Sequence, residues 1–522
     1  MFDSWIKNYN TRHSLFIVLP FALFILSPIL FLLVKSFSDD SGQITFEHLK
    51  ILALTSRQFG LMKNSLVLAV ATSLASVLIG VPVAFFIHRT DIWFKKILQI
   101  AVLIPLLVPP YIQALVWTDI APLFIYSLSG AVFVFTLSFF PFVTLIAGSG
   151  LHTADGMVEE ASLMSCGKWA TIQKVTLPLV TPHIMAGAII VFVFTIINFE
   201  VPDILRISVY PMEIFIHFSA YYDEKTATLL SLPLVCATLM LVWGQMMVMK
   251  NKSYIALGFD NTEQSVFPMN RFRLPGFILL SAVILISIII PLGVLIKGAG
   301  TGENYIRVFQ NARDQIFYSI FISGISALIM AGFSFIVSYY LVRTRGKMSM
   351  VLDYLFQLPF GIPSIVLGIG LIHVWNREWI DGIYTSSWIL IFAFVSGYSP
   401  FVIKVISARI KQIPLEWEEA GILGNAGRTR VLARIVLPLI MPAMISGFFI
   451  GFVLSLFNLG TALLVVPPGR ATLPISIYNF MHYGAMDMVY AQSLILIMIA
   501  CASGFILYLV YKFFLKRTSA HD

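Results

Sequence analysis

Glu159-Glu160-Ala161-Ser162 opens a polar stretch that continues through Gly167 to Leu177-Pro178-Leu179. The pattern returns half a chain later as Glu418-Glu419-Ala420-Gly421, Gly427 and Leu437-Pro438-Leu439. Glu159, Gly167 and Pro178 match Glu419, Gly427 and Pro438 at one common offset of 260 residues. Both copies interrupt sequence that is otherwise almost entirely apolar. The chain is therefore predicted to consist of two related halves, each with one polar loop where a soluble partner docks.

The composition is that of a membrane protein. Of its residues 58% are hydrophobic and 11% are charged, against about 25% charged in soluble domains. In lipid only helices or closed barrels satisfy the backbone polar groups. The apolar runs are about 20 residues long, the length that spans a bilayer as a helix, and they lack the alternation of barrel strands. We predict an all-α polytopic membrane protein.

Twelve membrane-spanning helices are predicted, six in each half. In the first half they lie near 15–34, 65–87, 97–117, 131–151, 183–204 and 227–249. In the second half they lie near 275–297, 318–342, 350–374, 386–406, 440–465 and 489–511. The first run is long for a signal peptide, so we interpret it as a retained helix. The predicted domains are a first repeat, 1–250, a polar linker, 251–274, and a second repeat, 275–522.

The loop charges predict the orientation of the chain. If the N-terminus is cytoplasmic, about two-thirds of the Lys and Arg residues fall in cytoplasmic segments, as the positive-inside rule requires. Both termini and both polar loops, 152–182 and 407–439, are then cytoplasmic. Six spans per half also give the two halves the same orientation, so they are parallel repeats. The net charge of +8 fits loops that face anionic lipid rather than nucleic acid.

Each polar loop has the composition of a short helix, a corner and a second helix. Helix-forming residues precede the glycine, and Pro414 suits the first turn of the second copy. Early carboxylates complement a helix N-terminus, and small residues such as Ala161 and Ala420 let another surface approach. Gly167 and Gly427 are expected to allow the positive φ of a corner. The Leu-Pro step then marks the return into the membrane.

These motifs resemble the signature of binding-protein-dependent ABC importer permeases, in which Glu-Ala-Ala is followed by Gly and Leu-Pro. The likeness extends over nearly the whole chain, and two copies in one chain resemble the fused permeases of the ferric-iron and thiamine uptake group. In that family the loop forms a coupling helix that sits in a cleft of the ATP-binding subunit. The resemblance assigns this role to Glu159, Glu160, Ala161, Gly167, Glu418, Glu419, Ala420 and Gly427.

The two copies depart from the family pattern in two ways. The last residue of Glu-Ala-Ala is Ser162 in the first copy and Gly421 in the second. The glycine expected seven places into the motif is Ser165 in one copy and Asn425 in the other. Asn tolerates left-handed geometry, whereas Ser165 leaves the corner to Gly167. The second copy is therefore the closer match, and the two loops are expected to hold their partners differently.

No enzymatic site is predicted in this chain. The sequence has no phosphate-binding loop of the G-x-x-x-x-G-K-[ST] type, so ATP is expected to be used by separate partner subunits. No Ser/His/Asp, Cys/His or paired-carboxylate arrangement in the sequence argues for an enzyme, and we expect no catalytic residue and no bound cofactor. The cysteines Cys166, Cys236 and Cys501 are far apart, which argues against a disulfide framework or a zinc site.

Polar residues in the fifth span of each half are candidates for the translocation path. Asn198 and Asn458 coincide at offset 260, and each span follows a polar loop directly. The alternative for both is an interhelical hydrogen bond, worth about 0.6 kcal/mol. Glu200 and Asp203 have no acidic counterparts in the second half, so they either meet a cationic substrate or are ordinary interfacial carboxylates.

The outer loops are predicted at 204–226 and 466–488. The first contains His217, Asp223 and tyrosines, which are plausible ligands for a hard metal ion. Because the resembled family selects its substrate mostly with an external binding protein, docking of that protein is the stronger prediction, and no metal site is assigned. Pro109-Pro110 and Pro363 are expected to bend the third span of each half.

The sequence therefore predicts the multi-pass permease of an ABC importer in the cell inner membrane. Its expected partners are ATP-binding subunits, two by the number of loops, an external solute-binding protein and lipid, with no nucleic acid. Ferric iron is the favoured substrate by resemblance, and thiamine, phosphonate or another small solute stay open. The alternatives are a secondary transporter of the major-facilitator type and a channel or scaffold without coupled transport.

Overall fold

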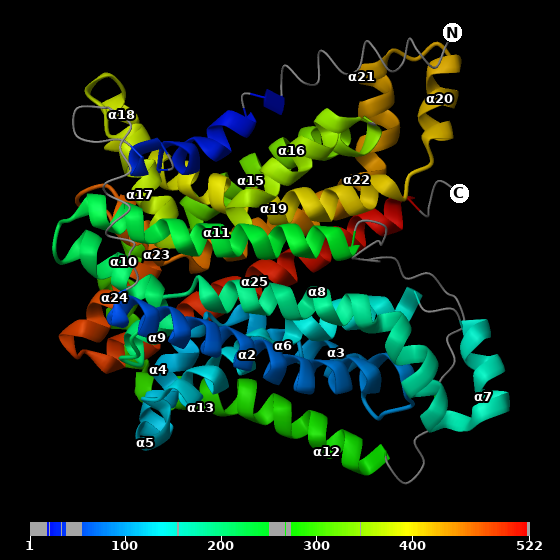
Figure 1. The fold of residues 1–522 in the computed structure, drawn as a ribbon, viewed down its shortest axis with the longest axis horizontal. Coiled ribbons are helices and arrows are strands. Elements are labelled where there is room, and N and C mark those ends of the chain that lie inside the picture. Colours follow the sequence, from blue (N-terminus) through cyan, green and yellow to red (C-terminus); the bar gives the residue numbers. More distant parts are fainter. Residues whose placement is uncertain are drawn as a thin grey trace. The chain divides into compact units, whose positions relative to one another are not determined.

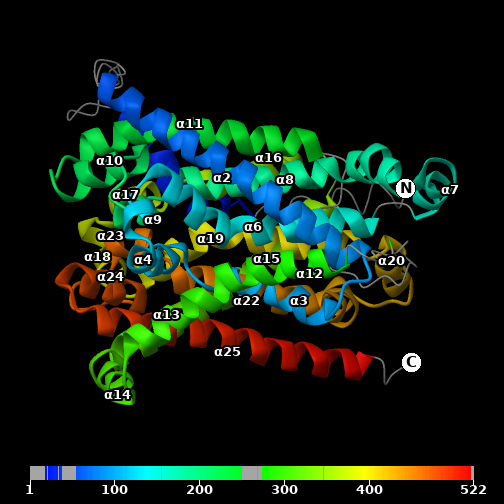
Figure 2. The same cartoon turned by 90° about the horizontal axis from the view of Figure 1, so that it is seen from below.

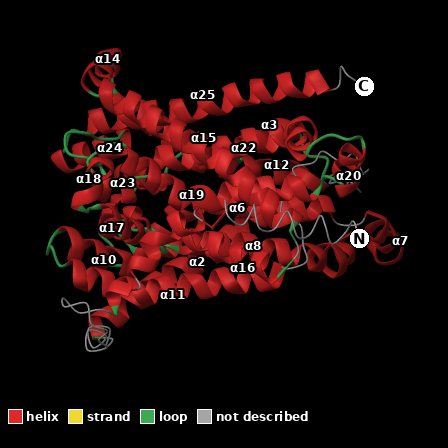
Figure 3. Ribbon diagram, turned by 90° about the horizontal axis from the view of Figure 1, so that it is seen from above, coloured by secondary structure: helices red, strands yellow, loops and turns green. Residues whose placement is uncertain are grey.

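The computed structural model describes residues 18–19, 21–32, 34–37, 55–153, 156–249, 267, 273–344 and 346–518. In this part of the chain the secondary structure is helical, and the one β-type pairing is an isolated bridge between Thr90 and Phe267 (Figure 3). The predicted linker 251–274 lies almost wholly outside the described residues. The all-α prediction is confirmed.

Nine of the described helices are long and apolar enough to cross a membrane, and two bent pairs raise the number to eleven. The nine are Ser56–Arg89, Leu128–His152, Val158–Ile196, Glu224–Leu241, Arg273–Ala299, Arg313–Arg343, Trp388–Lys411, Thr429–Phe457 and Met486–Val510. A shorter apolar helix, Phe21–Ser36, overlaps the first predicted span. Each of the other eleven predicted spans overlaps one of these helices or bent pairs.

The bent pairs are the third spans of the two halves. Lys95–Leu107 meets Pro110–Ile120 at 92°, and Lys347–Gly361 meets Ser364–Trp375 at 110°. The breaks fall at Pro109-Pro110 and Pro363, where proline removes a backbone donor and prevents an uninterrupted helix. The predicted bends are therefore confirmed, and they are sharp enough to split each span into two helices.

The chain forms two compact units whose membership crosses the repeat boundary. One unit, called here the 49–300 unit, comprises Leu49–Gly300. The other, called the 301–522 unit, comprises Thr301–Asp522 together with Met1–His48. The first helix of each sequence repeat therefore groups with the other repeat. The boundaries 1–250 and 275–522 remain a prediction about the sequence repeat, whereas packing divides the chain differently.

The 49–300 unit is built around α2 (Ser56–Arg89), α6 (Leu128–Thr153) and α8 (Leu177–Ile196), which pack side by side (Figure 1). Small residues allow these helices to approach closely. A Cβ at Gly80 would lie 2.8 Å from Val143 Cβ, and one at Gly187 would lie 3.0 Å from Val143 Cα. The tight three-helix core carries the polar loop at one end.

The remaining elements of the 49–300 unit surround this core. They are α3 (Lys95–Ala101), α4 (Pro110–Ile120), α5 (Pro122–Ile125), α7 (Gly156–Thr171), α9 (Glu200–Ile204), α10 (Tyr210–Ser219), α11 (Glu224–Met249), α12 (Arg273–Ile284) and α13 (Ile290–Ala299). The π-helical turn between α12 and α13 accepts a 2.8 Å hydrogen bond at Ser287 O from the Gln113 side chain of α4. This contact fixes the first helix of the second repeat inside the unit.

The 301–522 unit repeats the same core with α15 (Arg313–Arg343), α19 (Trp388–Lys411) and α22 (Leu437–Phe457) (Figure 2). Its other elements are α14 (Gly302–Asn311), α16 (Lys347–Gln357), α17 (Ser364–Trp375), α18 (Asp381–Tyr384), α20 (Leu415–Leu423), α21 (Arg428–Val431), α23 (Gly460–Val465), α24 (Leu473–Tyr483) and α25 (Met486–Thr518). Ala22 and Ile25 of helix Phe21–Ser36, together with Val18 before it, pack against buried residues of α15 and α16. The Ser396 hydroxyl donates to Ile25 O at 2.9 Å.

The fifth spans end earlier than the predicted ranges 183–204 and 440–465. Helix α8 ends at Ile196 and α22 ends at Phe457, and each is followed by a separate short helix, α9 or α23. The polar residues at these breaks give the physical reason, because they bond to the next helix rather than continuing the span. This is a correction to the predicted boundaries.

Candidate functional site

The two motif copies form the predicted helix, corner and helix at one end of their units, opposite α10 in the 49–300 unit and opposite α24 in the 301–522 unit (Figure 1). In the first copy, α7 is followed by a π-helical turn, Ile172–Thr176, and then by α8. In the second, α20 is followed by α21, a π-helical turn, Leu432–Val436, and α22. The repeated π turns are notable because such turns are common at functional sites.

The corners are made by different residues in the two copies. Gly167 has φ 74° and ψ 171°, a conformation open essentially to glycine alone. Ser165 stays within the helix, where its hydroxyl donates to Ala161 O at 3.2 Å. Gly167 therefore replaces the expected glycine, as predicted.

In the second copy the left-handed residue is Asn425, with φ 60°. Gly427 does not have a positive φ, so the expectation that it turns the corner is wrong. The hydrogen bond from Ala426 N to Gly421 O, 3.1 Å long, closes the end of α20 around Asn425. Helix α20 therefore ends before the chain reaches Gly427, and the asparagine provides the turn.

Glu159 in the first copy is fully buried and held by ionic and neutral donors. Its Oε2 lies 2.9 Å from Nη1 of Arg89, and both side chains have 0% exposure. The Thr176 hydroxyl donates to Glu159 Oε1 at 2.8 Å. Arg89 ends α2 and also donates from Nη2 to Leu151 O at 2.7 Å. The glutamate thus fastens α7 to the end of α2.

Glu418 has the same position in the second copy. Its Oε1 accepts from Arg343 Nε at 2.8 Å and lies 2.7 Å from Nη2, while Tyr339 OH donates to Oε2 at 2.6 Å. Arg343 ends α15 and donates from Nη2 to Ile413 O at 2.9 Å. The structurally equivalent glutamates are therefore Glu159 and Glu418, so the first copy is one residue shorter between its carboxylates and its glycine.

The second glutamate of each pair has a different environment from the first. Glu160 and Glu419 are exposed, as are Ala161 and Ala420. Large apolar side chains are exposed on the same loops: Met164 at 92%, Trp169 at 71%, Trp417 at 52% and Leu423 at 77%. Exposed aromatic and apolar groups beside carboxylates are typical of a protein-binding surface.

The fifth-span asparagines act as helix caps. Asn198 Oδ1 accepts from Val201 N at 3.0 Å, and Asn458 Oδ1 accepts from Ala462 N at 3.0 Å. Asn458 also donates to Tyr398 OH at 2.6 Å. These bonds satisfy one backbone donor in the first turn of α9 and one in the first turn of α23. The bonds give both asparagines a structural role, and their place in a translocation path stays a prediction.

Glu200 and Asp203, the other two path candidates, lie on α9 and are partly buried. Helix α9 packs against α4, the second arm of the bent third span. The two carboxylates therefore lie on a helix that packs against the second arm of that span. Their role toward a cation stays a prediction.

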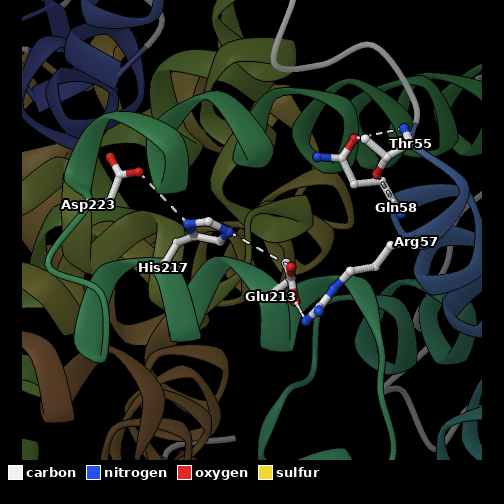
Figure 4. Close-up of polar contacts among 6 residues, drawn as sticks. All are labelled: Thr55, Arg57, Gln58, Glu213, His217 and Asp223. Carbon is white, nitrogen blue, oxygen red and sulfur yellow. Dashed lines mark hydrogen bonds and ion pairs between the residues drawn. The ribbon is translucent and has the colours of Figure 1, made fainter.

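At the opposite end of the 49–300 unit a chain of charged groups joins α2 to α10 and the loop after it (Figure 4). Arg57 Nη2 lies 2.9 Å from Glu213 Oε2, and His217 Nε2 lies 3.8 Å from Glu213 Oε1. His217 Nδ1 lies 3.9 Å from Asp223 Oδ2. The two ring nitrogens therefore face different carboxylates, and these groups do not converge on one point. Within the described residues there is no group of three or more His, Cys, Asp or Glu side chains that could hold a metal ion.

Two pKa values at this outer end follow from the same contacts. Burial raises the pKa of Asp223, but hydrogen bonds from Thr226 and the charges of His217 and Lys225 outweigh it, so the pKa is lowered. Thr226 N donates to Asp223 Oδ1 at 3.0 Å, which caps α11. Burial, with a smaller contribution from Glu213, raises the pKa of Tyr210 to about 12. At neutral pH Asp223 is therefore charged and Tyr210 is protonated.

Sequence reasoning missed the arginines and hydroxyls that hold the buried glutamates. Arg89 and Arg343 coincide at an offset of 254 residues, and a repeated arginine at the end of an apolar span was the available signal. It marked the repeat but gave no partner, because the glutamates lie far along the chain.

The chain was compared with known proteins. The profile of the family described as "Binding-protein-dependent transport system inner membrane component" matches residues 76–244 and 332–520. The "Fe(3+)-transport system permease protein FbpB 2" of Haemophilus influenzae is 22% identical over 478 residues, covering 88% of this chain and 91% of that protein. The "Ferric transport system permease protein FbpB" of Actinobacillus pleuropneumoniae is 21% identical, and the match covers 93% of this chain and 76% of that protein. The "Spermidine/putrescine transport system permease protein PotC" of Escherichia coli is 29% identical, and the match covers 37% of this chain and 70% of that protein.

Proposed function

Because the chain belongs to the family of binding-protein-dependent transport system inner membrane components, we propose that it passes ferric iron through the membrane in an ATP-driven importer. The chain is a fused permease with two copies of the family domain. Ferric iron is favoured because relatives named for its transport match along most of the chain. The polyamine permease matches about one copy. Thiamine, phosphonate and other small solutes are the alternatives.

The observation that carries the proposal is that the two glutamates of each pair differ in burial and in partners. One carboxylate is buried against an arginine at the end of a span, and its neighbour is exposed beside large apolar groups. Such a helix is fixed to the membrane core on one side and open to a protein on the other. We assign the open side to a separate ATP-hydrolysing subunit, one for each loop, because the sequence lacks a phosphate-binding loop.

Closure of the ATPase subunits would then move α7 and α20, and with them the ends of α2 and α15. Helix α2 packs against α6 and α8, and α15 packs against α19 and α22. A displacement of α2 and α15 would therefore reach the fifth spans and the bent third spans. The positive-inside rule places the coupling end in the cytoplasm and the α10 and α24 end outside. We assign the outer end to the solute-binding protein. A secondary transporter of the major-facilitator type is not retained, because the chain belongs to another family.

The permease is proposed to pass iron without selecting it. Ferric iron is a hard cation that prefers oxygen ligands, and the described residues contain no converging ligand group. Selection would then lie with the external protein, which releases its cargo above the permease.

Uptake of radioactive ferric iron by cells with and without the chain tests the substrate, with labelled thiamine and phosphonate measured in parallel. Iron uptake that depends on the chain and on ATP supports the proposal. Uptake of thiamine or phosphonate alone overturns the substrate.

The coupling role is tested with the double variant Glu160→Gln and Glu419→Gln. Glu416→Gln is the matched control, since Glu416 is an exposed carboxylate on α20 outside the motif. The double variant should lose uptake and stimulated ATP hydrolysis, and the control should retain both. Intact uptake and hydrolysis in the double variant would contradict the coupling assignment.

A further inference from the structure

The two buried glutamates, Glu159 and Glu418, bind the same kinds of donor, but the donors lie at different positions in the two repeats. Each accepts from the arginine that ends the second span of its repeat, Arg89 or Arg343. Each also accepts from one hydroxyl, that of Thr176 or that of Tyr339. A buried carboxylate needs such additional donors, because an ion pair alone does not repay its desolvation.

The hydroxyls occupy exchanged positions in the two repeats. Thr176 ends the π turn before α8, and the residue that ends the matching π turn before α22 is Val436. Tyr339 lies one helical turn before Arg343, and the matching residue, one turn before Arg89, is Phe85. Each repeat therefore has a hydroxyl where the other has a hydrocarbon side chain. Both repeats keep a hydroxyl that donates to the buried glutamate, but the residue that carries this hydroxyl lies on a different helix.

A second pair of matching positions carries hydroxyls in the first loop only. In the first loop the hydroxyls of Ser162 and Thr171 lie 3.0 Å apart, joining the two arms across the corner. The matching residues are Gly421 and Val431. A Cβ at Gly421 would lie 2.7 Å from Ile435 Cδ1 and 3.1 Å from Val431 Cγ2, so these arms meet through apolar contact. The first loop is thus closed by directional bonds and the second by packing.

We propose that Thr176 and Tyr339 are positioning residues that give the two coupling helices different mechanical attachments. Glu159 ties α7 to α2 through Arg89 and to the start of the fifth span through Thr176. Glu418 ties α20 to α15 through both Arg343 and Tyr339, which leaves α22 without this link. The first coupling helix then moves spans two and five together, and the second moves span two and lets the fifth span move separately.

This inference rests on the proposed coupling to ATPase subunits, and matched spin-label pairs test it in the purified complex. One pair is placed at Met164 and Leu179 and the other at the matching residues Leu423 and Leu439, in a background without the three native cysteines. Distances are measured without nucleotide and with a non-hydrolysable ATP analogue. The second distance should shift on nucleotide binding, and the first should stay nearly constant.

Two exchange variants move the hydroxyl within each repeat. Thr176→Val should make the first distance respond to nucleotide, and Thr176→Val with Phe85→Tyr should give the first loop the behaviour of the second while retaining a donor for Glu159. Tyr339→Phe with Val436→Thr should make the second distance constant. Measurement of ATP hydrolysed per solute transported checks function in the same variants, and a loss of coupling is expected for Thr176→Val.

Equal responses of the two label pairs in the unchanged protein, with no effect of Thr176→Val, overturn the inference and leave the coupling role standing. Absence of any nucleotide response at either pair, with no co-purifying ATPase, overturns the proposed function instead. If Thr176→Val fails to assemble, the double exchange that restores a donor supplies the same comparison.

Discussion

Arg89 and Glu159 form a 2.9 Å ion pair in which both side chains are completely buried. The pair joins the last residue of a membrane-spanning helix to the helix of the polar loop. Its counterpart, Arg343 with Glu418, is nearly as buried, at 11% and 6% exposure. In both repeats an ion pair therefore joins the polar loop to the end of the second span.

Replacement of Glu159 by Gln should destabilise the protein markedly. It leaves the Arg89 guanidinium buried without its counter-charge, a change that costs about 3–5 kcal/mol in buried pairs. Thermal unfolding in detergent should occur at a clearly lower temperature than for the unchanged chain. Glu160→Gln is the matched control, because its side chain is exposed, and it should unfold at the unchanged temperature. Equal melting temperatures for both variants would show that the buried pair does not contribute.

Replacement of Gly167 by Ala should strain the first corner. The φ of 74° with ψ 171° is accessible essentially to glycine, and the cost is about 1–3 kcal/mol. Gly427→Ala is the control in the other copy, since a Cβ there meets nothing within 4 Å and φ is not positive. Denaturation should separate the two variants. A loss of stability confined to Gly427→Ala would contradict the assignment of the corners.

Replacement of Gly80 by Ala should disturb the core of the 49–300 unit. Its Cβ would lie 2.8 Å from Val143 Cβ and 2.9 Å from Phe140 O, so α2 and α6 must separate. Overpacking of this kind costs about 1–3 kcal/mol. Gly60→Ala on the same helix has free space and should be neutral or stabilising by up to about 1 kcal/mol. Comparison of their unfolding temperatures checks this, and a stable Gly80→Ala variant would argue against the close helix contact.

Asp223 predicts a pH dependence confined to acid. Its pKa is lowered in the folded protein, so its charge contributes stability above the ordinary pKa of 3.8, and this contribution is lost as pH falls through the folded value. Asn can retain the cap of α11 but carries no charge. The melting temperature of the unchanged chain should therefore exceed that of Asp223→Asn at pH 7, and the difference should shrink below about pH 4. A difference that grows in acid would reverse the assigned sign.

Much of the fold follows from local sequence. The apolar runs predict the spans because lipid forces helical hydrogen bonding, and Pro109-Pro110 and Pro363 predict the bends because proline cannot continue a helix. The predicted fifth spans run past the ends of α8 and α22 because Asn198 and Asn458 lie inside apolar runs. Only the structure shows that their side chains cap the next helices.

The coupling site was predicted in part. The paired glutamates identify the loops, but adjacent residues on a helix face different directions, and composition does not say which one is buried. The tolerance of asparagine for left-handed geometry predicts that Asn425 can turn a corner, and it does so in place of Gly427. The hydroxyl that donates to the buried glutamate belongs to Thr176 in one repeat and to Tyr339 in the other. This difference could not be predicted, because the sequence does not show which residues meet across the loop.

The sequence by itself determined that this is an all-α membrane protein of two repeats, because hydropathy and internal spacing are properties of the chain alone. Only the tertiary structure decided that the first helix of each repeat packs with the other repeat's unit. It also decided that Glu159 and Glu418 face inward to arginines while Glu160 and Glu419 face outward. The physical reason is that these contacts join residues far apart in sequence, where local pattern carries no information about partner or direction.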